Sequence, residues 1–165
     1  MKIEKPDEDE LEELYQKFGE PEIKEEKVSL TNLEYTGDYP DCKGEAVLLI
    51  SKEDKIVGVR HHRSEKFVLP MGRVWESEDF VEGAKREGKE ETGLDIEINS
   101  LDEIRKVRYD FSNDELERWD LLFGCEVVEG KPQPEDEEEI AEAELFYAEW
   151  YWNKGFYIIR ETKER

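Results

Sequence analysis

Cysteine and histidine are scarce in this chain of 165 residues, which has two of each. The two cysteines, Cys42 and Cys125, lie far apart and show neither the spacing of a zinc site nor the density of a disulfide framework. The N-terminal residues lack the apolar core of a signal peptide, and no apolar run approaches the roughly 20 residues of a membrane helix. We therefore expect a cytoplasmic protein without membrane association.

Basic residues are also in short supply, with 24 Lys and Arg against 46 Asp and Glu and a net charge of −22. A protein that binds an extended nucleic-acid backbone needs the opposite sign, so we expect no such binding. Four Trp, seven Tyr and seven Phe supply enough apolar surface to exclude disorder throughout the chain. The composition predicts one folded domain that takes a small-molecule substrate, and it leaves a homodimer open.

The N-terminal part of the chain predicts one short helix. Residues 7–18 place apolar side chains at helical spacing between acidic capping residues and Gly19. We assign residues 1–22 to an N-terminal extension that contains this amphipathic helix, and residues 23–165 to the main domain. The role expected for the helix is packing or capping.

Short strand-like segments surround a single longer helical segment in the main domain. The segment 151–160 is compatible with helix or strand, and no internal repeat is present. Strands before and after a central helix predict a mixed sheet with helices packed on it. The predicted strands are 27–36, 45–51, 56–60, 66–70, 96–98, 104–111, 119–128 and part of 140–150.

The central helix carries three carboxylates on one face. Glu87, Glu90 and Glu91 project from neighbouring turns of a helix predicted from about residue 78 to residue 91. Like charges at these spacings repel each other, so their clustering indicates a bound cation. Carboxylate oxygens are the ligands that Mg²⁺ and Mn²⁺ prefer. A solvated helix face is the alternative interpretation.

The residues around this helix complete a strand–loop–helix unit. Gly72 follows a short strand and lets the backbone approach a ligand, while Ser77 is the predicted N-cap and Gly93 the predicted C-cap. Arg86 can pair with Glu78 across the helix and loop. We expect that pair to hold the unit rigid, which is a structural role.

These positions resemble the Nudix box, in which glycine, glutamate, an Arg-Glu pair, two adjacent glutamates and a second glycine follow at fixed spacings. The resemblance is sharp over residues 72–94 and general over roughly 27–160. The matching residues are Gly72, Glu78, Arg86, Glu87, Glu90, Glu91, Gly93 and Leu94.

Two positions depart from the family pattern. Gly88 stands where the family has an aliphatic residue that packs into the core, and Met71 stands where many members have glycine. Glycine inside a helix costs roughly 1 kcal/mol of helix propensity. An aliphatic residue at position 88 is therefore expected to raise the thermal stability.

The resemblance implies a Nudix-type α/β/α sandwich with a mixed β-sheet, to which this chain adds the short N-terminal helix. It also implies Mg²⁺-dependent (or Mn²⁺-dependent) hydrolysis of a diphosphate bond in a nucleoside diphosphate-linked compound. Carried over, the metal ligands are Glu87, Glu90, Glu91 and the Gly72 carbonyl, and Glu87 serves in some members as the base. Metal ions in such a site neutralise phosphate charge and acidify the attacking water.

A downstream acidic run is the second candidate for the base. The family's general base is in some members a glutamate in a later loop, and Glu138 and Glu139 lie in the polar segment 131–139. One of these two is expected to supply a further ligand or the base. A solvated acidic loop is the alternative.

Substrate-binding candidates lie outside the box. Tyr109 stands where dinucleoside polyphosphate hydrolases of the family have a tyrosine. The alternative is that Tyr109 is a strand residue that packs on the sheet. Arg60 and Arg63 belong to the one basic cluster, which is suited to phosphate contacts or to an exposed hairpin end. Two other functions remain open: a catalytically inactive nucleotide-binding or regulatory module on the same fold, and an acidic interaction protein.

Overall fold

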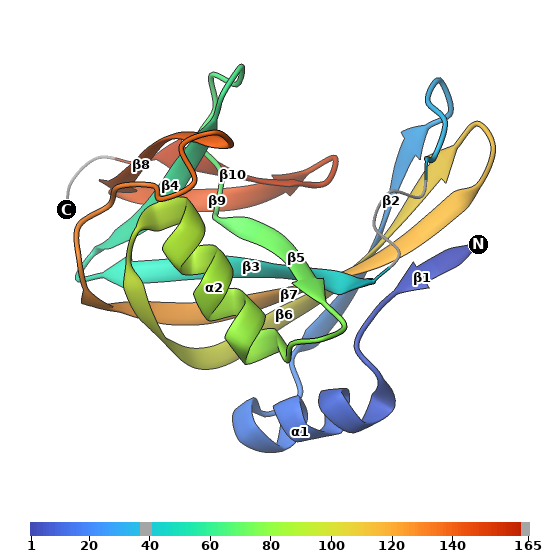
Figure 1. Cartoon of the computed structure of the whole chain (residues 1–165), viewed down its shortest axis with the longest axis horizontal. Coiled ribbons are helices and arrows are strands. Elements are labelled where there is room, and N and C mark those ends of the chain that lie inside the picture. The colour runs from blue at the N-terminus through green and yellow to red at the C-terminus, as the bar shows by residue number, and fades with distance from the viewer. Residues whose placement is uncertain (37–40, 163–165) are drawn as a thin grey trace.

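A computed structural model describes residues 1–36 and 41–162 of the chain. The described residues form two helices, α1 (Glu8–Phe18) and α2 (Phe80–Thr92), and α2 crosses in front of the long strands in Figure 1. The strands are β1 (Lys2–Glu4), β2 (Glu22–Leu30), β3 (Cys42–Lys52), β4 (Lys55–His61), β5 (Met71–Trp75), β6 (Asp95–Phe111), β7 (Glu115–Glu129), β8 (Ile140–Phe146), β9 (Ala148–Asn153) and β10 (Phe156–Glu161).

Within the described residues, eight strands form one mixed sheet. Its order is β2-β6-β7-β3-β4-β8, with β1 paired to β7 and β5 paired to β3. β3 runs parallel to β7 and antiparallel to β5, and β2 runs parallel to β6. β6 and β7 are long strands of 17 and 15 residues, and with β2 they extend beyond the rest of the sheet as an arm at the upper right of Figure 1.

Each face of the sheet has its own cover. On one face Phe80 and Ala84 of α2 pack in a single core with Leu11 and Leu14 of α1. On the other face the hairpin formed by β9 and β10 packs against the sheet, where Tyr157 is fully buried. The continuous apolar run of β3 fits this position because both of its faces are buried. The predicted sandwich around a mixed sheet is confirmed, and its second cover is a β hairpin.

The predicted N-terminal helix is present as α1. Asp7 caps it by accepting a hydrogen bond from the backbone N–H of Glu10 at 2.9 Å, and Gly19 ends it. Glu10 in turn accepts a hydrogen bond at 3.0 Å from the backbone N–H of Phe80, the first residue of α2. α1 thus satisfies one of the unpaired N–H groups that begin the box helix. The domain boundary at residue 22 stays a prediction.

Several predicted boundaries are wrong because a partner strand or cap decides them. The strand predicted for 27–36 begins at Glu22, where it pairs with β6, and 96–98 and 104–111 belong to one long strand. Residues 66–70 form no strand, and only Val68 makes isolated bridges, to Val59 and Ile158. Residues 151–160, which the sequence left open between helix and strand, lie in the β9–β10 hairpin. α2 begins after Asp79, which caps it instead of Ser77.

Gly88 faces the core as predicted, but the space for a side chain there is already filled. A Cβ atom at this position would lie 2.8 Å from Ile96 Cδ1 and 3.3 Å from Leu48 Cδ1. The first of these atoms is the end of a flexible side chain, so alanine needs only a small shift. A larger aliphatic residue would overpack this region, which corrects the expectation that any aliphatic residue stabilises the helix.

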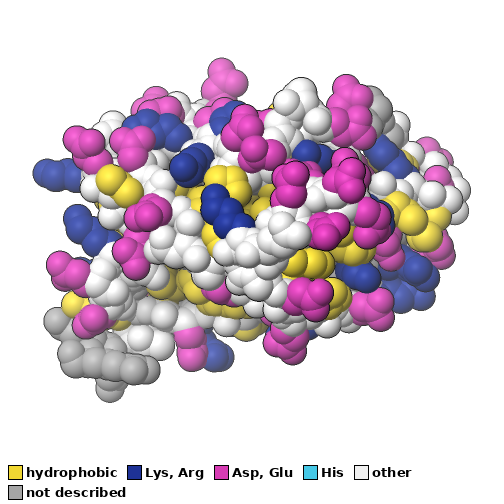
Figure 2. Space-filling view, turned by 90° about the horizontal axis from the view of Figure 1, so that it is seen from below, with side chains coloured by type: hydrophobic (Ala, Val, Ile, Leu, Met, Phe, Trp, Pro, Cys, Tyr) yellow, Lys and Arg dark blue, Asp and Glu magenta, His cyan; other side chains and the backbone are white. Residues whose placement is uncertain are grey.

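The surface is acidic but mixed. Figure 2 shows acidic side chains spread across the visible face with lysines and arginines between them. Charges on the surface are also locally paired, as in Lys24–Glu103 and Lys27–Asp110, both 3.0 Å apart. Neither described helix is long and apolar enough to span a membrane.

Candidate active site

Gly72 lies directly against Glu87 of α2. β5 pairs with β3, and the ladder places Gly72 opposite Ala46 in the middle of β3. A Cβ atom at Gly72 would lie 2.0 Å from the carboxyl carbon of Glu87, closer than any two such atoms can approach. Glycine lets the strand backbone pack directly against this carboxylate, and any side chain here would force the end of Glu87 to move.

Arg86 connects the box residues to one another. Its guanidinium donates two hydrogen bonds to Glu78, of 3.1 and 2.6 Å, and one of 2.9 Å to the carbonyl of Arg73. The same side chain donates from Nη1 to Glu87 at 2.9 Å and to Glu90 at 3.2 Å. Glu78 also accepts a hydrogen bond from the backbone N–H of Trp75. The expected rigid Arg86–Glu78 pair is formed, and it holds two further carboxylates side by side.

Glu87 and Glu91 are buried without enough partners to offset the loss of water. Burial raises the pKa of Glu87 to about 7, although Arg86 acts in the opposite direction. Burial raises the pKa of Glu91 well above its usual value, and the charges of Glu87 and Glu139 add to the effect. Glu91 Oε1 accepts a hydrogen bond of 3.1 Å from the backbone N–H of Met71, while its Oε2 is buried with no partner.

Glu139 joins this group from the loop between β7 and β8. Ligand atoms of His61, Glu91 and Glu139 all lie within 4.8 Å of one another. Burial raises the pKa of Glu139, and the neighbouring His61 lowers it. His62 points elsewhere, because its Nε2 lies 2.7 Å from the carbonyl oxygen of Glu137.

The loop that carries Glu139 is anchored to the end of α2. The backbone N–H groups of Glu135 and Asp136 donate to the carbonyl of Glu90, and that of Gln133 donates to the carbonyl of Thr92. Gly93 ends the helix in the left-handed region at φ 74°, and a Cβ atom there would lie 2.1 Å from the carbonyl oxygen of Gln133. Gly93 thus both ends the helix and admits the loop.

These residues fit a divalent metal ion. A carboxylate oxygen of Glu91 is buried and unpartnered, Glu87 is held in a cradle that a Cβ atom would fill, and Glu139 lies close by. Oxygen donors of this kind are what Mg²⁺ and Mn²⁺ take. A cation would also offset the burial and the mutual repulsion that raise the pKa values of these carboxyl groups.

Glu139 of this group lines a cavity of about 570 Å³, and so does Gly72, which lies against Glu87. Its box end is lined by Gly72, His61 and Glu139. Its aromatic end, formed largely by the arm and by the turn between β9 and β10, is lined by Tyr35, Tyr109, Phe111 and Phe156. A cavity of this size is in the range of small-molecule sites.

A family model for the NUDIX domain matches residues 41–161. The chain belongs to the Nudix family. The matched range includes the box residues Gly72, Arg86 and Glu91. The predicted Nudix hydrolase is confirmed at the level of the family. A comparison with curated proteins gives no match.

Solved structures show the same fold at low sequence identity. A MutT NUDIX hydrolase from Burkholderia pseudomallei has a TM-score of 0.52 and 18% identity over 62% of this chain and 81% of its own. A NUDIX hydrolase from Nitrosomonas europaea has a TM-score of 0.50 and 23% identity over 62% and 70%. A UDP-X diphosphatase has a TM-score of 0.50 and 19% identity over 86% of this chain and 59% of its own.

The predicted substrate residues of this Nudix domain lie in different places. Tyr109 lines the cavity, where burial raises its pKa. Arg60 and Arg63 are not among the lining residues: Arg60 pairs with Glu142 at 2.8 Å, and Arg63 is exposed with φ 69°. Glu138 is exposed and outside the carboxylate group that contains Glu139. Their functional roles stay predictions.

Sequence reasoning did not find Arg118 and its buried partners. Arg118 lines the cavity beside Tyr109, and its side chain donates to Glu4 of β1 at 2.7 Å and to Glu45 of β3 at 3.3 Å. Nearby Asp120 is fully buried and accepts a hydrogen bond of 2.8 Å from Tyr157. The one signal in the sequence was that Arg118 is a charged residue next to an apolar strand segment. Such a residue indicates a buried ion pair only once the neighbouring strands, which supply its partners, are known.

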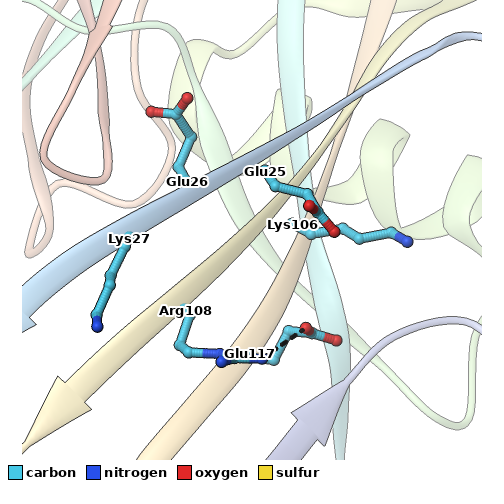
Figure 3. Close-up of a pocket in the computed structure, with 6 residues that line it drawn as sticks. All are labelled: Glu25, Glu26, Lys27, Lys106, Arg108 and Glu117. Atoms are coloured by element: carbon cyan, nitrogen blue, oxygen red, sulfur yellow. Dashed lines mark ion pairs between the residues drawn. The ribbon is translucent and has the colours of Figure 1, made fainter.

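A second hollow, of about 310 Å³, lies on the arm and has no such chemistry. Figure 3 shows its lining, which mixes three acidic and three basic side chains from β2, β6 and β7. Arg108 lies 4.0 Å from Glu117, the ion pair marked there. The charges of such exposed pairs largely cancel in water, so the first cavity is the candidate active site.

Proposed function

We propose that this Nudix domain hydrolyses the diphosphate bond of a nucleoside diphosphate-linked compound with the help of Mg²⁺ or Mn²⁺. The observation that carries the proposal is that Glu139 lies beside the buried Glu91 at one end of a cavity whose other end is aromatic. The first end suits a cation with a diphosphate, and the second suits a nucleoside.

The metal ligands in this proposal are Glu87, Glu90, Glu91 and the Gly72 carbonyl, with Glu139 as a further ligand or as the base. A bound divalent cation would neutralise phosphate charge and lower the pKa of a coordinated water. Arg86 holds Glu87 and Glu90 in place through one shared nitrogen. Preorganised carboxylates of this kind need no rearrangement during the reaction.

Glu139 is the better placed of the two loop candidates for the base. It lies with His61 beside Glu91, whereas Glu138 lies outside this group. In the proposed step a water oxygen attacks phosphorus, the bridging P–O bond breaks, and Glu139 takes the proton of the water. Burial raises the pKa of Glu139, which makes it a stronger proton acceptor than a fully solvated glutamate.

The substrate class is supported by the aromatic end. Tyr35 and Phe111 pack with ring centroids 5.2 Å apart, and Phe156 lines the same cavity. Rings at such a surface stack on nucleobases. Within the class, a dinucleoside polyphosphate is the first compound to test because Tyr109 lies at this end.

The test is turnover of a substrate panel by the purified protein with Mg²⁺, with Mn²⁺ and with EDTA. The panel contains diadenosine polyphosphates, ADP-ribose, NADH, deoxynucleoside triphosphates and a UDP-linked sugar. We expect release of nucleoside monophosphate or diphosphate products that stops in EDTA. Nucleotide binding without turnover would instead support a regulatory module, and absence of both would contradict the proposal.

A further inference from the structure

The turn between β9 and β10 places two side chains in the active-site cavity. Asn153 pairs with Phe156, so the hairpin closes through the two residues Lys154 and Gly155. Both have positive φ, 51° and 94°, as in the tight turns that suit the twist of a hairpin. Lys154, Gly155 and Phe156 all line the cavity, and in Figure 1 the tip of this hairpin points toward the arm.

Lysine is an unfavourable residue at the first position of this turn. Residues with a side chain rarely adopt positive φ, and asparagine before glycine is the preferred pair for such a turn. A bulky residue held at positive φ costs conformational free energy, and such strained residues cluster at functional sites. The same turn with asparagine would be at least as stable.

The tip is held in one position against the cavity wall. A Cβ atom at Gly155 would lie 3.0 Å from the hydroxyl oxygen of Tyr109, so the turn packs closely on that ring. Behind the tip, Tyr157 is fully buried, packs on Trp150 and donates a hydrogen bond to Asp120. Lys154 and Phe156 therefore sit on a rigid support, which is what a recognition element needs.

Lys154 differs from Arg118, the other cavity cation near Tyr109. Arg118 is already held by the carboxylates of Glu4 and Glu45, so it has little charge to offer an anion. The ion pairs among the described residues include no partner for Lys154. In a chain of net charge −22, a lysine that lines the cavity without a carboxylate is a specific place for a phosphate group.

Phe156 offers an aromatic surface next to this charge. Its side chain is exposed to 57% although it is large and apolar. It shares the cavity with the packed pair of Tyr35 and Phe111 from the arm. An exposed aromatic ring at a cavity wall is suited to stacking on a base.

We propose that the tip of the β9–β10 hairpin is the substrate-recognition element of this enzyme, in which Lys154 binds a phosphate oxygen of the diphosphate and Phe156 stacks on the nucleobase. The proposal rests on the proposed function for the identity of the substrate. It assigns the choice between nucleoside-linked and base-free diphosphates to Phe156, and part of the affinity for both to Lys154.

Two non-hydrolysable probes separate these roles in a calorimetric binding experiment with Mg²⁺. Methylene-bridged ADP has a base, and methylenediphosphonate has none. We expect Lys154→Asn to weaken binding of both probes roughly tenfold, as for a lost charged hydrogen bond. Phe156→Ala is expected to weaken only the nucleotide, also roughly tenfold.

The controls exclude unfolding and a general loss of positive charge. Lys154→Asn should leave the melting temperature unchanged or raise it, because asparagine suits the turn. Lys131→Asn makes the same change in net charge at a residue that does not line the cavity, and it should leave both affinities unchanged.

Each part of the proposal can be overturned by a separate result. Wild-type affinity of Lys154→Asn for both probes would overturn the phosphate contact, and so would an equal loss in Lys131→Asn. An equal loss for both probes in Phe156→Ala would overturn stacking, and failure of the wild-type protein to bind either probe would overturn the whole. These results are binding measurements, so they are distinct from absence of turnover on the substrate panel, which would contradict the proposed hydrolysis.

Discussion

The two ends of the active-site cavity differ in how their residues are distributed along the chain. At the box end, Gly72, Glu87 and Glu91 come from one short segment, and Glu139 joins them from a loop anchored to the same helix. At the aromatic end, Tyr35, Tyr109 and Phe156 come from three distant parts of the chain. One end is a local motif and the other is a product of the whole sheet.

This difference follows from what each end has to do. A cation needs several oxygens at fixed separations, and one helix next to a close glycine provides them within a few turns. Recognition of a nucleoside needs surfaces on opposite sides of the ligand, and only separate elements can provide those. The residues proposed for the chemistry are therefore close together in the sequence, whereas the residues proposed for substrate recognition are far apart in it.

The largest expected effect is at the box end. Glu91→Gln removes a buried carboxylate oxygen that has no protein partner, and we expect turnover to fall on the order of a hundredfold or more. The melting temperature of the metal-free protein should not fall, because the substitution removes a desolvated charge. Steady-state kinetics with thermal melts checks both, and Tyr109→Phe is the matched change at the aromatic end. Equal losses of turnover in Glu91→Gln and Tyr109→Phe would contradict the assignment of the chemistry to the box end.

Gly72→Ala should have the next largest effect. The added Cβ atom would lie 2.0 Å from the Glu87 carboxyl carbon, so Glu87 or the strand must move. We expect at least roughly a tenfold loss of turnover, since metal sites tolerate little displacement of a ligand. Titration of Mg²⁺ against activity should show a weaker metal response, and an unchanged response would contradict the close packing.

The pH dependence of stability tests the electrostatics of the box end. The pKa of Glu87 is raised to about 7 in the folded protein and that of Glu91 is raised well above 4.5, so their protonated forms contribute stability that is lost as pH rises through these values. Without metal, the melting temperature should fall by roughly a few degrees between pH 5 and pH 8 from this source.

Burial also raises the pKa of Asp120, so Asp120 contributes to the same pH dependence. Added Mg²⁺ separates the contribution of Glu87 and Glu91 from that of Asp120. Mg²⁺ should raise the melting temperature more at pH 8 than at pH 5.5, because ligand carboxylates must be deprotonated. The same increment at both pH values would show that the buried carboxylates do not bind the metal.

The smallest expected effect lies on the core side of the box helix, at Gly88. For Gly88→Ala the gain in helix propensity of about 1 kcal/mol is opposed by the contact with Ile96, so we expect a change within about 1 kcal/mol and unchanged turnover. Gly88→Leu should destabilise by about 1–3 kcal/mol through overpacking. Chemical denaturation measures both, and a stabilised leucine variant would show that the core has unused space here.

The sequence predicted elements best where the signal was local. Asp7 and Gly19 bound α1 as expected, and Arg86 meets Glu78 as its spacing suggested. It failed at the early start of β2 and left residues 151–160 open between helix and strand, since strand pairing depends on residues far away in the chain.

The sequence by itself determined the Nudix box, with Gly72, with Arg86 paired to Glu78, and with carboxylates at helical spacing. The period of one helix fixes how these carboxylates lie relative to one another. Only the tertiary structure decided that Glu139 rather than Glu138 lies beside Glu91, and that Arg118 is held by Glu4 of β1. It also decided that Phe156 and Tyr35 share one cavity. These relations join segments far apart in the chain, and the folding of the sheet brings them together.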